Sequence, residues 1–172
     1  MQRVIDSILG QATDDGRLPG VVASVVNGDG VAYEGAFGVR SLETGVAMTT
    51  DTVLRVASQT KSVVAVACLQ AVEDGLLDLD APAADVVPSL GDLEVLEGFD
   101  ESGTPILRPA VTTVTLRNLL THTSGSVYEF WNAESARWLE ATGQPDFMSG
   151  RLATLDRPLA FDPGTDVAYG LG

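Results

Sequence analysis

The sequence predicts an α/β fold in which an antiparallel sheet is flanked by helices and lies beside a mainly helical region. Residues 21–26 and 31–39 are rich in β-branched and alternating apolar residues, and an Asn-Gly-Asp-Gly turn separates them, so they favour a β-hairpin. Residues 63–69 are apolar without interruption in a helical context, which predicts a helix buried on nearly every side. Such a helix needs structure on both flanks, as between a sheet and a helical region.

The composition is typical of one globular domain spanning residues 1–172. Hydrophobic residues make up 45% of the chain and charged residues 20%, and the length is enough for a real core. The net charge of -14 argues against nucleic acid or an anionic membrane as a partner. Residues 1–10 lack the apolar region of a secretory signal, no apolar run nears the ~20 residues of a membrane span, and Cys68 is the only cysteine. These features predict a cytoplasmic protein.

The N-terminal elements follow from local patterns. Residues 2–15 are expected to form an amphipathic helix, because its apolar residues fall on one side: Val4, Ile5, Ile8 and Leu9. The hairpin follows, and residues 53–56 are expected to be a short extended segment. The helix that contains the apolar run is predicted from Ser58 to Asp74, with Gly75 as its stop.

The C-terminal elements are shorter. Residues 93–108 suggest a small hairpin around Asp-Glu-Ser-Gly. Thr115 is the candidate N-cap of a short helix, and residues 127–142 are expected to form a third helix with an aromatic cluster. Residues 161–165 form a turn that leads to Ala-Tyr-Gly at 168–170.

Ser58 and Lys61 form the first candidate catalytic pair. Lys61 is the only lysine, against nine arginines, and Ser58 lies one helical turn before it, at the start of the buried helix. A serine hydroxyl needs a base, and desolvation in an apolar cleft is expected to lower the lysine pKa enough to supply one, which arginine could not do. Free N–H groups at the helix start, including that of Ser58, suit an oxyanion. In the alternative reading, Ser58 merely caps the helix and Lys61 extends into water.

Tyr169 is the candidate third member of the site. A phenol beside an ammonium is shifted towards phenolate and can move a proton between nucleophile and leaving group. A tyrosine after a Pro-Gly turn also fits simple core packing.

The remaining reactive residues favour structural interpretations. His122, the only histidine, is expected to satisfy carbonyls at the end of the short helix, and Cys68 to be an inert core thiol. One histidine and one cysteine are too few for a typical metal site, so no metal is expected. An aromatic patch is expected to pack in the core or to form a wall of an apolar substrate pocket; it comprises Tyr128, Phe130, Trp131 and Trp138.

Three segments taken together resemble a known family: LRVASQTKSVVAVACLQAVEDGLLDLDAP, TLRNLLTHTSG and PLAFDPGTDVAYG. They are similar to the serine β-lactamase and penicillin-binding-protein superfamily, and most closely to its class C-like esterases, the family VIII carboxylesterases. The resemblance implies a β-lactamase/transpeptidase-like fold and hydrolysis of short-chain esters without a cofactor. It makes Ser58 the acylated nucleophile, Lys61 its partner and Tyr169 the general base or acid, and leaves open which of the two takes the first proton.

Two departures from the family pattern bear on function. Class C β-lactamases carry Tyr-x-Asn, whereas Tyr169 is followed by Gly170 and Leu171, which favours small-molecule esters over β-lactams. The family's later strands and its C-terminal Lys-Thr-Gly motif do not occur in the 172 residues. We therefore expect the N-terminal part of one catalytic domain, inactive without its C-terminal remainder. The alternatives are a β-lactamase or D-Ala-D-Ala carboxypeptidase, and a non-catalytic penicillin-binding-like module.

Overall fold

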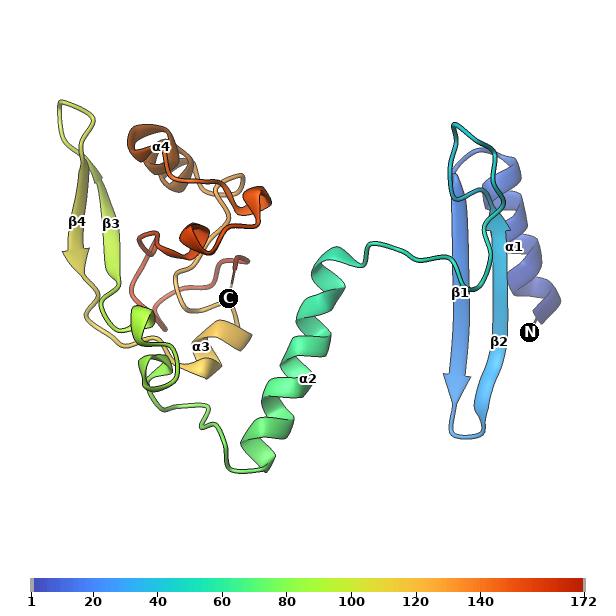
Figure 1. The fold of residues 1–172 in the computed structure, drawn as a ribbon, viewed down its shortest axis with the longest axis horizontal. Helices are drawn as coiled ribbons and strands as arrows, with labels where there is room; N and C mark the ends of the chain where they lie inside the picture. Colours follow the sequence, from blue (N-terminus) through green and yellow to red (C-terminus); the bar gives the residue numbers. More distant parts are fainter. Residues whose placement is uncertain (1, 172) are drawn as a thin grey trace. The chain divides into compact units, whose positions relative to one another are not determined.

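The computed structural model describes residues 2–171 and divides into two compact units, one up to Ser58 and one from Gln59 onward. In the first unit, helix α1 (Gln2–Asp14) is followed by strands β1 (Gly20–Asn27) and β2 (Gly30–Gly38) (Figure 1). The strands pair antiparallel across the turn at residues 27–30, with a register shift between Val25 and Val26. The predicted helix and hairpin are both confirmed.

Helix α1 packs on the hairpin, chiefly on β2. Tyr33 anchors this contact: it is 4% exposed, and its hydroxyl donates a hydrogen bond of 2.8 Å to the Asp6 carboxylate. Within the described residues, β1 and β2 pair only with each other. The extended segment expected at residues 53–56 does not form a strand, because no neighbouring strand pairs with it, and Val53 is 95% exposed.

Helix α2 (Thr60–Glu73) follows a 3-10 turn, η1 (Ala57–Gln59), and ends before Gly75, whose φ of 72° suits a helix stop. The helix is as predicted, but the expectation that it is buried on nearly every side is wrong. None of its residues is buried, and Val63 is 71% exposed. The half-buried side chains fall mainly on one stripe spaced by four, three and four residues: Lys61, Ala65, Cys68 and Val72. A helix is buried all round only where structure covers both flanks, and the described chain covers this stripe alone.

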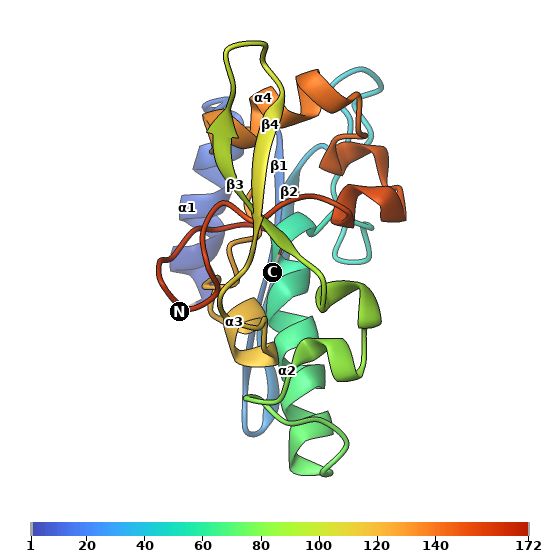
Figure 2. The ribbon, with the colours of Figure 1, turned by 90° about the vertical axis from the view of Figure 1, so that its left-hand side faces the viewer.

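The second unit holds a second antiparallel hairpin, β3 (Glu94–Phe99) and β4 (Pro105–Pro109), as predicted. The Asp100 carboxylate organises the turn between the strands, accepting hydrogen bonds from the backbone N–H groups of Ser102 and Thr104. Helix α4 (Ala133–Thr142) packs against β3 (Figure 2). At this contact the Arg137 guanidinium lies 4.0 Å from the centre of the Phe99 ring.

The core of this unit forms where a late segment returns to β3. Leu159 exchanges backbone hydrogen bonds with Glu94 and Leu96 and is buried with Val95 and Val114. Helix α3 (Leu116–Leu120) begins nearby, with Thr115 as its N-cap in a reciprocal capping box with Asn118, as the sequence predicted for Thr115.

Residues 127–132 correct a sequence expectation. The helix predicted from residue 127 begins only at Ala133, because the Asn132 side chain accepts the Ser135 N–H and caps the helix there. Residues 129–131, just before the cap, form a turn instead. The α/β class is nevertheless confirmed, with small antiparallel sheets and helices. Among residues 2–171, no helix is both long and apolar enough to cross a bilayer.

Candidate active site

The Lys61 ammonium, in the first turn of α2, lies between two tyrosines. Its Nζ donates a hydrogen bond of 2.9 Å to the Tyr128 hydroxyl. The same nitrogen is 4.9 Å from the centre of the Tyr169 ring and 5.3 Å from that of Tyr128, within the range of cation–π attraction. The structure therefore brings Lys61 and Tyr169 together and adds Tyr128 to them.

Tyr128 is 7% exposed and sits in the turn that precedes α4. A buried ion pair fixes this turn: Glu129 accepts a 2.8 Å hydrogen bond from Arg157 and another from the Phe147 N–H. The Tyr128 ring packs against Phe130 and Phe147. The segment that presents the Tyr128 hydroxyl to Lys61 is thus held by both charge and aromatic packing.

Sequence reasoning placed Tyr128 in the aromatic patch, as core or pocket wall, and missed its contact with Lys61. The two residues are 67 positions apart, and no local pattern links them. Phe130 and Trp131 of the same patch are mostly exposed, whereas Trp138 is buried in α4. The prediction of core packing therefore holds for Trp138 but not for Phe130 or Trp131.

Tyr169 follows the predicted turn at residues 161–165, where Thr165 N–H donates to the Asp162 carbonyl. Its ring centre lies 4.7 Å from that of His122 and 5.8 Å from that of Tyr128. The next residue, Gly170, passes so close to Ser126 that a Cβ there would overlap the Ser126 carbonyl oxygen. A residue without a side chain is therefore required directly after Tyr169.

Ser58 belongs to the 3-10 turn η1, which leads directly into α2. Ala57 before it has a φ of 45°, a left-handed conformation that is costly for any residue with a Cβ. The division between the two units falls between Ser58 and Gln59, so the approach of the Ser58 hydroxyl to Lys61 stays a prediction from the sequence spacing.

The electrostatics of Lys61 differ from expectation. Burial lowers the pKa of the ammonium as predicted, but hydrogen bonds to Tyr128 and Tyr169 raise it, and the pKa ends above its ordinary value of 10.5. The predicted downward shift is wrong because two phenolic oxygens more than offset the desolvation. Lys61 is therefore an ammonium at neutral pH.

A cavity of about 350 Å³ opens beside Tyr169. Its lining is mostly apolar and includes one amide; the residues are Val127, Trp131, Asn132, Ala168 and Tyr169. The Asn132 Oδ1 is already engaged as the cap of α4. The cavity can thus receive a compact apolar group next to the Tyr169 phenol.

His122 also lies at this site, against sequence expectation. Its ring packs on Tyr169, and the buried Nδ1 has no hydrogen-bond partner within residues 2–171. The prediction that the His122 side chain caps the α3 carbonyls is therefore wrong. The backbone N–H of His122 donates to the Leu119 carbonyl instead.

The other reactive side chains of the described chain do not form a second site. Cys68 is half-buried rather than a fully buried core thiol. In the described part of the chain, no three or more His, Cys, Asp or Glu residues cluster as metal ligands would.

Comparison with known proteins places this site in context. The chain is 36% identical to lovastatin esterase of Penicillium rubens, covering 98% of this chain and 43% of the relative. It is 33% identical to monacolin J acid methylbutanoyltransferase of Aspergillus terreus, covering 97% and 42%. It matches unliganded simvastatin synthase (LovD) from Aspergillus terreus with a TM-score of 0.85 at 32% identity, over 98% of this chain and 45% of that structure.

The chain thus spans about two fifths of the length of the curated relatives that it matches. Over that span the fold is that of the serine β-lactamases and transpeptidases. Residues 5–170, nearly the whole chain, match the Beta-lactamase family, and the chain belongs to that family.

Proposed function

We propose that this chain carries the acyl-transfer site of a serine hydrolase that cleaves short-chain carboxylic esters, with Ser58 as the acylated nucleophile. The observation that carries the proposal is the Lys61 ammonium, held by the Tyr128 hydroxyl and facing the Tyr169 ring, one helical turn after Ser58 in the sequence. A charged amine between two phenols has little purpose in a purely structural helix, where it would extend into water.

Tyr169 is the proton acceptor in this proposal. The raised pKa of Lys61 keeps the amine protonated, and an ammonium stabilises a neighbouring phenolate. The Ser58 hydroxyl gives its proton to the Tyr169 oxygen as Oγ attacks the ester carbonyl carbon. The tetrahedral intermediate then collapses, the C–O bond to the alcohol breaks, and the leaving oxygen takes the proton from Tyr169.

Deacylation runs through the same groups. Water gives a proton to Tyr169 and attacks the acyl carbon, and the bond to Ser58 Oγ breaks as that oxygen regains the proton. Free N–H groups at the start of α2, which has no side-chain N-cap bond, are proposed to stabilise the oxyanion in both steps. No metal and no cofactor enter either step.

The cavity beside Tyr169 supports a compact apolar acyl group as the part of the ester that is bound. The acyl group can then be transferred either to water or to an alcohol. One relative is named as an esterase and another as a methylbutanoyltransferase, so transfer to an alcohol in place of water is the second candidate function. The narrower assignment to family VIII carboxylesterases stays a prediction.

The test is hydrolysis of p-nitrophenyl butyrate by the chain, expressed with any further residues that its gene encodes. Ser58→Ala is expected to abolish the hydrolysis and the labelling of the protein by a phosphonate ester. Ser62→Ala is the matched control, because Ser62 is an exposed serine on the same helix. Unchanged labelling of the Ser58→Ala protein would contradict the proposal.

The same preparation separates the remaining alternatives. Turnover of nitrocefin above that of p-nitrophenyl butyrate favours a β-lactamase, and release of D-alanine from a D-Ala-D-Ala peptide favours a carboxypeptidase. An acyl product that grows with added alcohol, at the expense of free acid, identifies a transferase. A folded protein that fails to label at all is a non-catalytic module.

A further inference from the structure

We propose that His122 is a positioning residue that holds the Tyr169 phenol in place for proton transfer. This inference rests on the proposed function, because it assigns His122 a role through Tyr169. The structure gives three independent observations: the backbone conformation of His122, the anchoring of its neighbours, and its two contacts with the Tyr169 segment.

The backbone of His122 adopts a conformation that its side chain disfavours. Its φ is 57°, and among residues 2–171 only Ala57, directly before Ser58, is another non-glycine residue with positive φ. Such strained residues persist only where their surroundings enforce them, and they cluster at functional sites.

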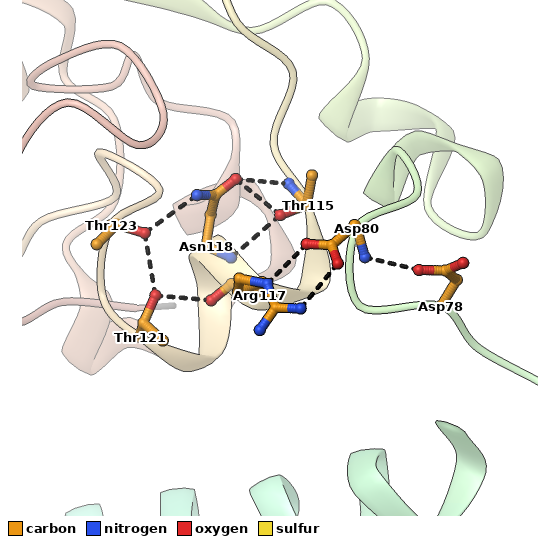
Figure 3. A network of polar contacts seen from close by, with 7 residues as sticks. All are labelled: Asp78, Asp80, Thr115, Arg117, Asn118, Thr121 and Thr123. Carbon is orange, nitrogen blue, oxygen red and sulfur yellow. Dashed lines mark hydrogen bonds and ion pairs between the residues drawn. The ribbon is translucent and has the colours of Figure 1, made fainter. Parts of the chain in front are cut away.

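A polar network next to α3 enforces this conformation (Figure 3). The Asn118 side chain donates to the Thr123 hydroxyl at 3.1 Å, and the Thr123 N–H donates to the Asn118 carbonyl at 2.9 Å. The Thr121 hydroxyl donates to the Arg117 carbonyl at 2.7 Å and lies 3.0 Å from that of Thr123. Both neighbours of His122 are thereby tied to α3, and the residue between them is held in the left-handed conformation.

His122 meets the Tyr169 segment twice. Its carbonyl accepts a 2.9 Å hydrogen bond from the Ala168 N–H, next to Tyr169 in the chain. Its ring lies on the Tyr169 ring with centres 4.7 Å apart and an interplanar angle of 51°, a favourable aromatic arrangement. One residue thus fixes both the backbone before Tyr169 and the face of its ring.

The charge state of His122 fits positioning rather than proton transfer. Burial, with a smaller contribution from the Lys61 ammonium, lowers the pKa of the imidazole below its ordinary 6.5. The ring is therefore neutral at pH 7, and its buried Nδ1 has no partner to pass a proton to within the described residues.

The experiment compares His122→Asn with His122→Phe. Asparagine tolerates a positive φ and keeps the backbone bond but removes the ring, whereas phenylalanine keeps a ring of similar size. We expect His122→Asn to lower kcat for p-nitrophenyl butyrate by on the order of tenfold, with KM nearly unchanged, because the loss falls on the transition state. His122→Phe is expected to restore most of kcat. Rates are normalised to the sites labelled by a phosphonate ester.

A control variant and a second readout keep the inference separable from the proposed function. Phe99→Leu removes a ring elsewhere in the unit and is expected to leave kcat unchanged. In protein labelled with 3-fluorotyrosine, His122→Asn is expected to shift the ¹⁹F signal of Tyr169 and to leave that of Tyr33 in place, whether or not esters are cleaved.

Two kinetic results would overturn the inference. The first is wild-type kcat in His122→Asn. The second is a kcat of His122→Phe as low as that of His122→Asn, which would make the imidazole itself chemically necessary. An unmoved Tyr169 signal in His122→Asn would also overturn it. Full activity of Ser58→Ala would instead overturn the proposed function. The ¹⁹F signal of Tyr169 would then still test whether His122 positions the Tyr169 ring.

Discussion

Lys61 donates a 2.9 Å hydrogen bond to the hydroxyl of Tyr128, across 67 residues of sequence. This bond joins the first turn of α2 to the turn that precedes α4. It also helps to raise the pKa of the ammonium, and so to decide which group at the site carries a proton.

Tyr128→Phe removes the hydroxyl that accepts this bond. A hydrogen bond to a charged group contributes about 1.5–3 kcal/mol, so the variant is expected to lower kcat/KM by roughly tenfold or more. The measurement is steady-state ester hydrolysis. Tyr33→Phe is the matched control, because it removes a phenolic hydroxyl that bonds Asp6 in the first unit; equal losses in the two variants would contradict the role of Tyr128.

Lys61 is predicted to titrate above pH 10.5. It is the only lysine, so its side-chain ¹³C signal in lysine-labelled protein reports this pKa directly. Because the folded pKa is raised, the stabilising contribution is complete below about pH 10.5 and is lost as the pH rises through the folded value. A midpoint below 10.5 would contradict the raised pKa, and only a midpoint near neutral pH would restore Lys61 as a candidate base.

Substitution of Lys61 tests through activity whether this residue acts as an ammonium or as a base. Arginine keeps the positive charge and cannot act as a base at neutral pH. Lys61→Arg is therefore expected to keep measurable esterase activity, while Lys61→Met is expected to lose it. If Lys61→Arg and Lys61→Met both fold and are labelled equally by a phosphonate but are equally inactive, the result would favour Lys61 as the proton acceptor.

Gly170→Ala places a methyl group against the Ser126 carbonyl oxygen. The segment that carries Tyr169 must then move, and the variant is expected to lose both activity and thermal stability. Gly28→Ala is the control, since a Cβ at Gly28 meets no atom within 4 Å. A Tm and a kcat for Gly170→Ala that match those of Gly28→Ala would contradict the close approach.

Arg157→Met breaks the ion pair that holds the turn of Tyr128. The side chains of Arg157 and Glu129 are only 7% and 12% exposed, so the variant leaves a carboxylate unpaired and largely buried. The free energy of unfolding is expected to fall by about 3 kcal/mol, as measured by urea denaturation. Arg17→Met, which breaks an exposed pair with Asp15, is expected to change it little.

Local patterns were enough to predict much of the fold. The hairpin at residues 20–38, the second hairpin around Asp100 and the cap at Thr115 each depend on neighbours in sequence. Turn and cap geometry are properties of a few consecutive residues, so they can be deduced without the tertiary structure. Local reasoning failed at residue 127, because the side chain of Asn132 caps the helix and the helix begins at Ala133, six residues later than expected.

The sequence by itself singled out Ser58, Lys61 and Tyr169, because one lysine a helical turn after a serine is a local arrangement and the motif order resembles a family. Only the tertiary structure selected Tyr128 and His122 from the other aromatic residues and gave the direction of the Lys61 pKa. The exposure of α2 also depends on the tertiary structure. The physical reason is common to all of these: hydrogen bonding and desolvation depend on which distant segments pack together, and no spacing along the chain encodes that.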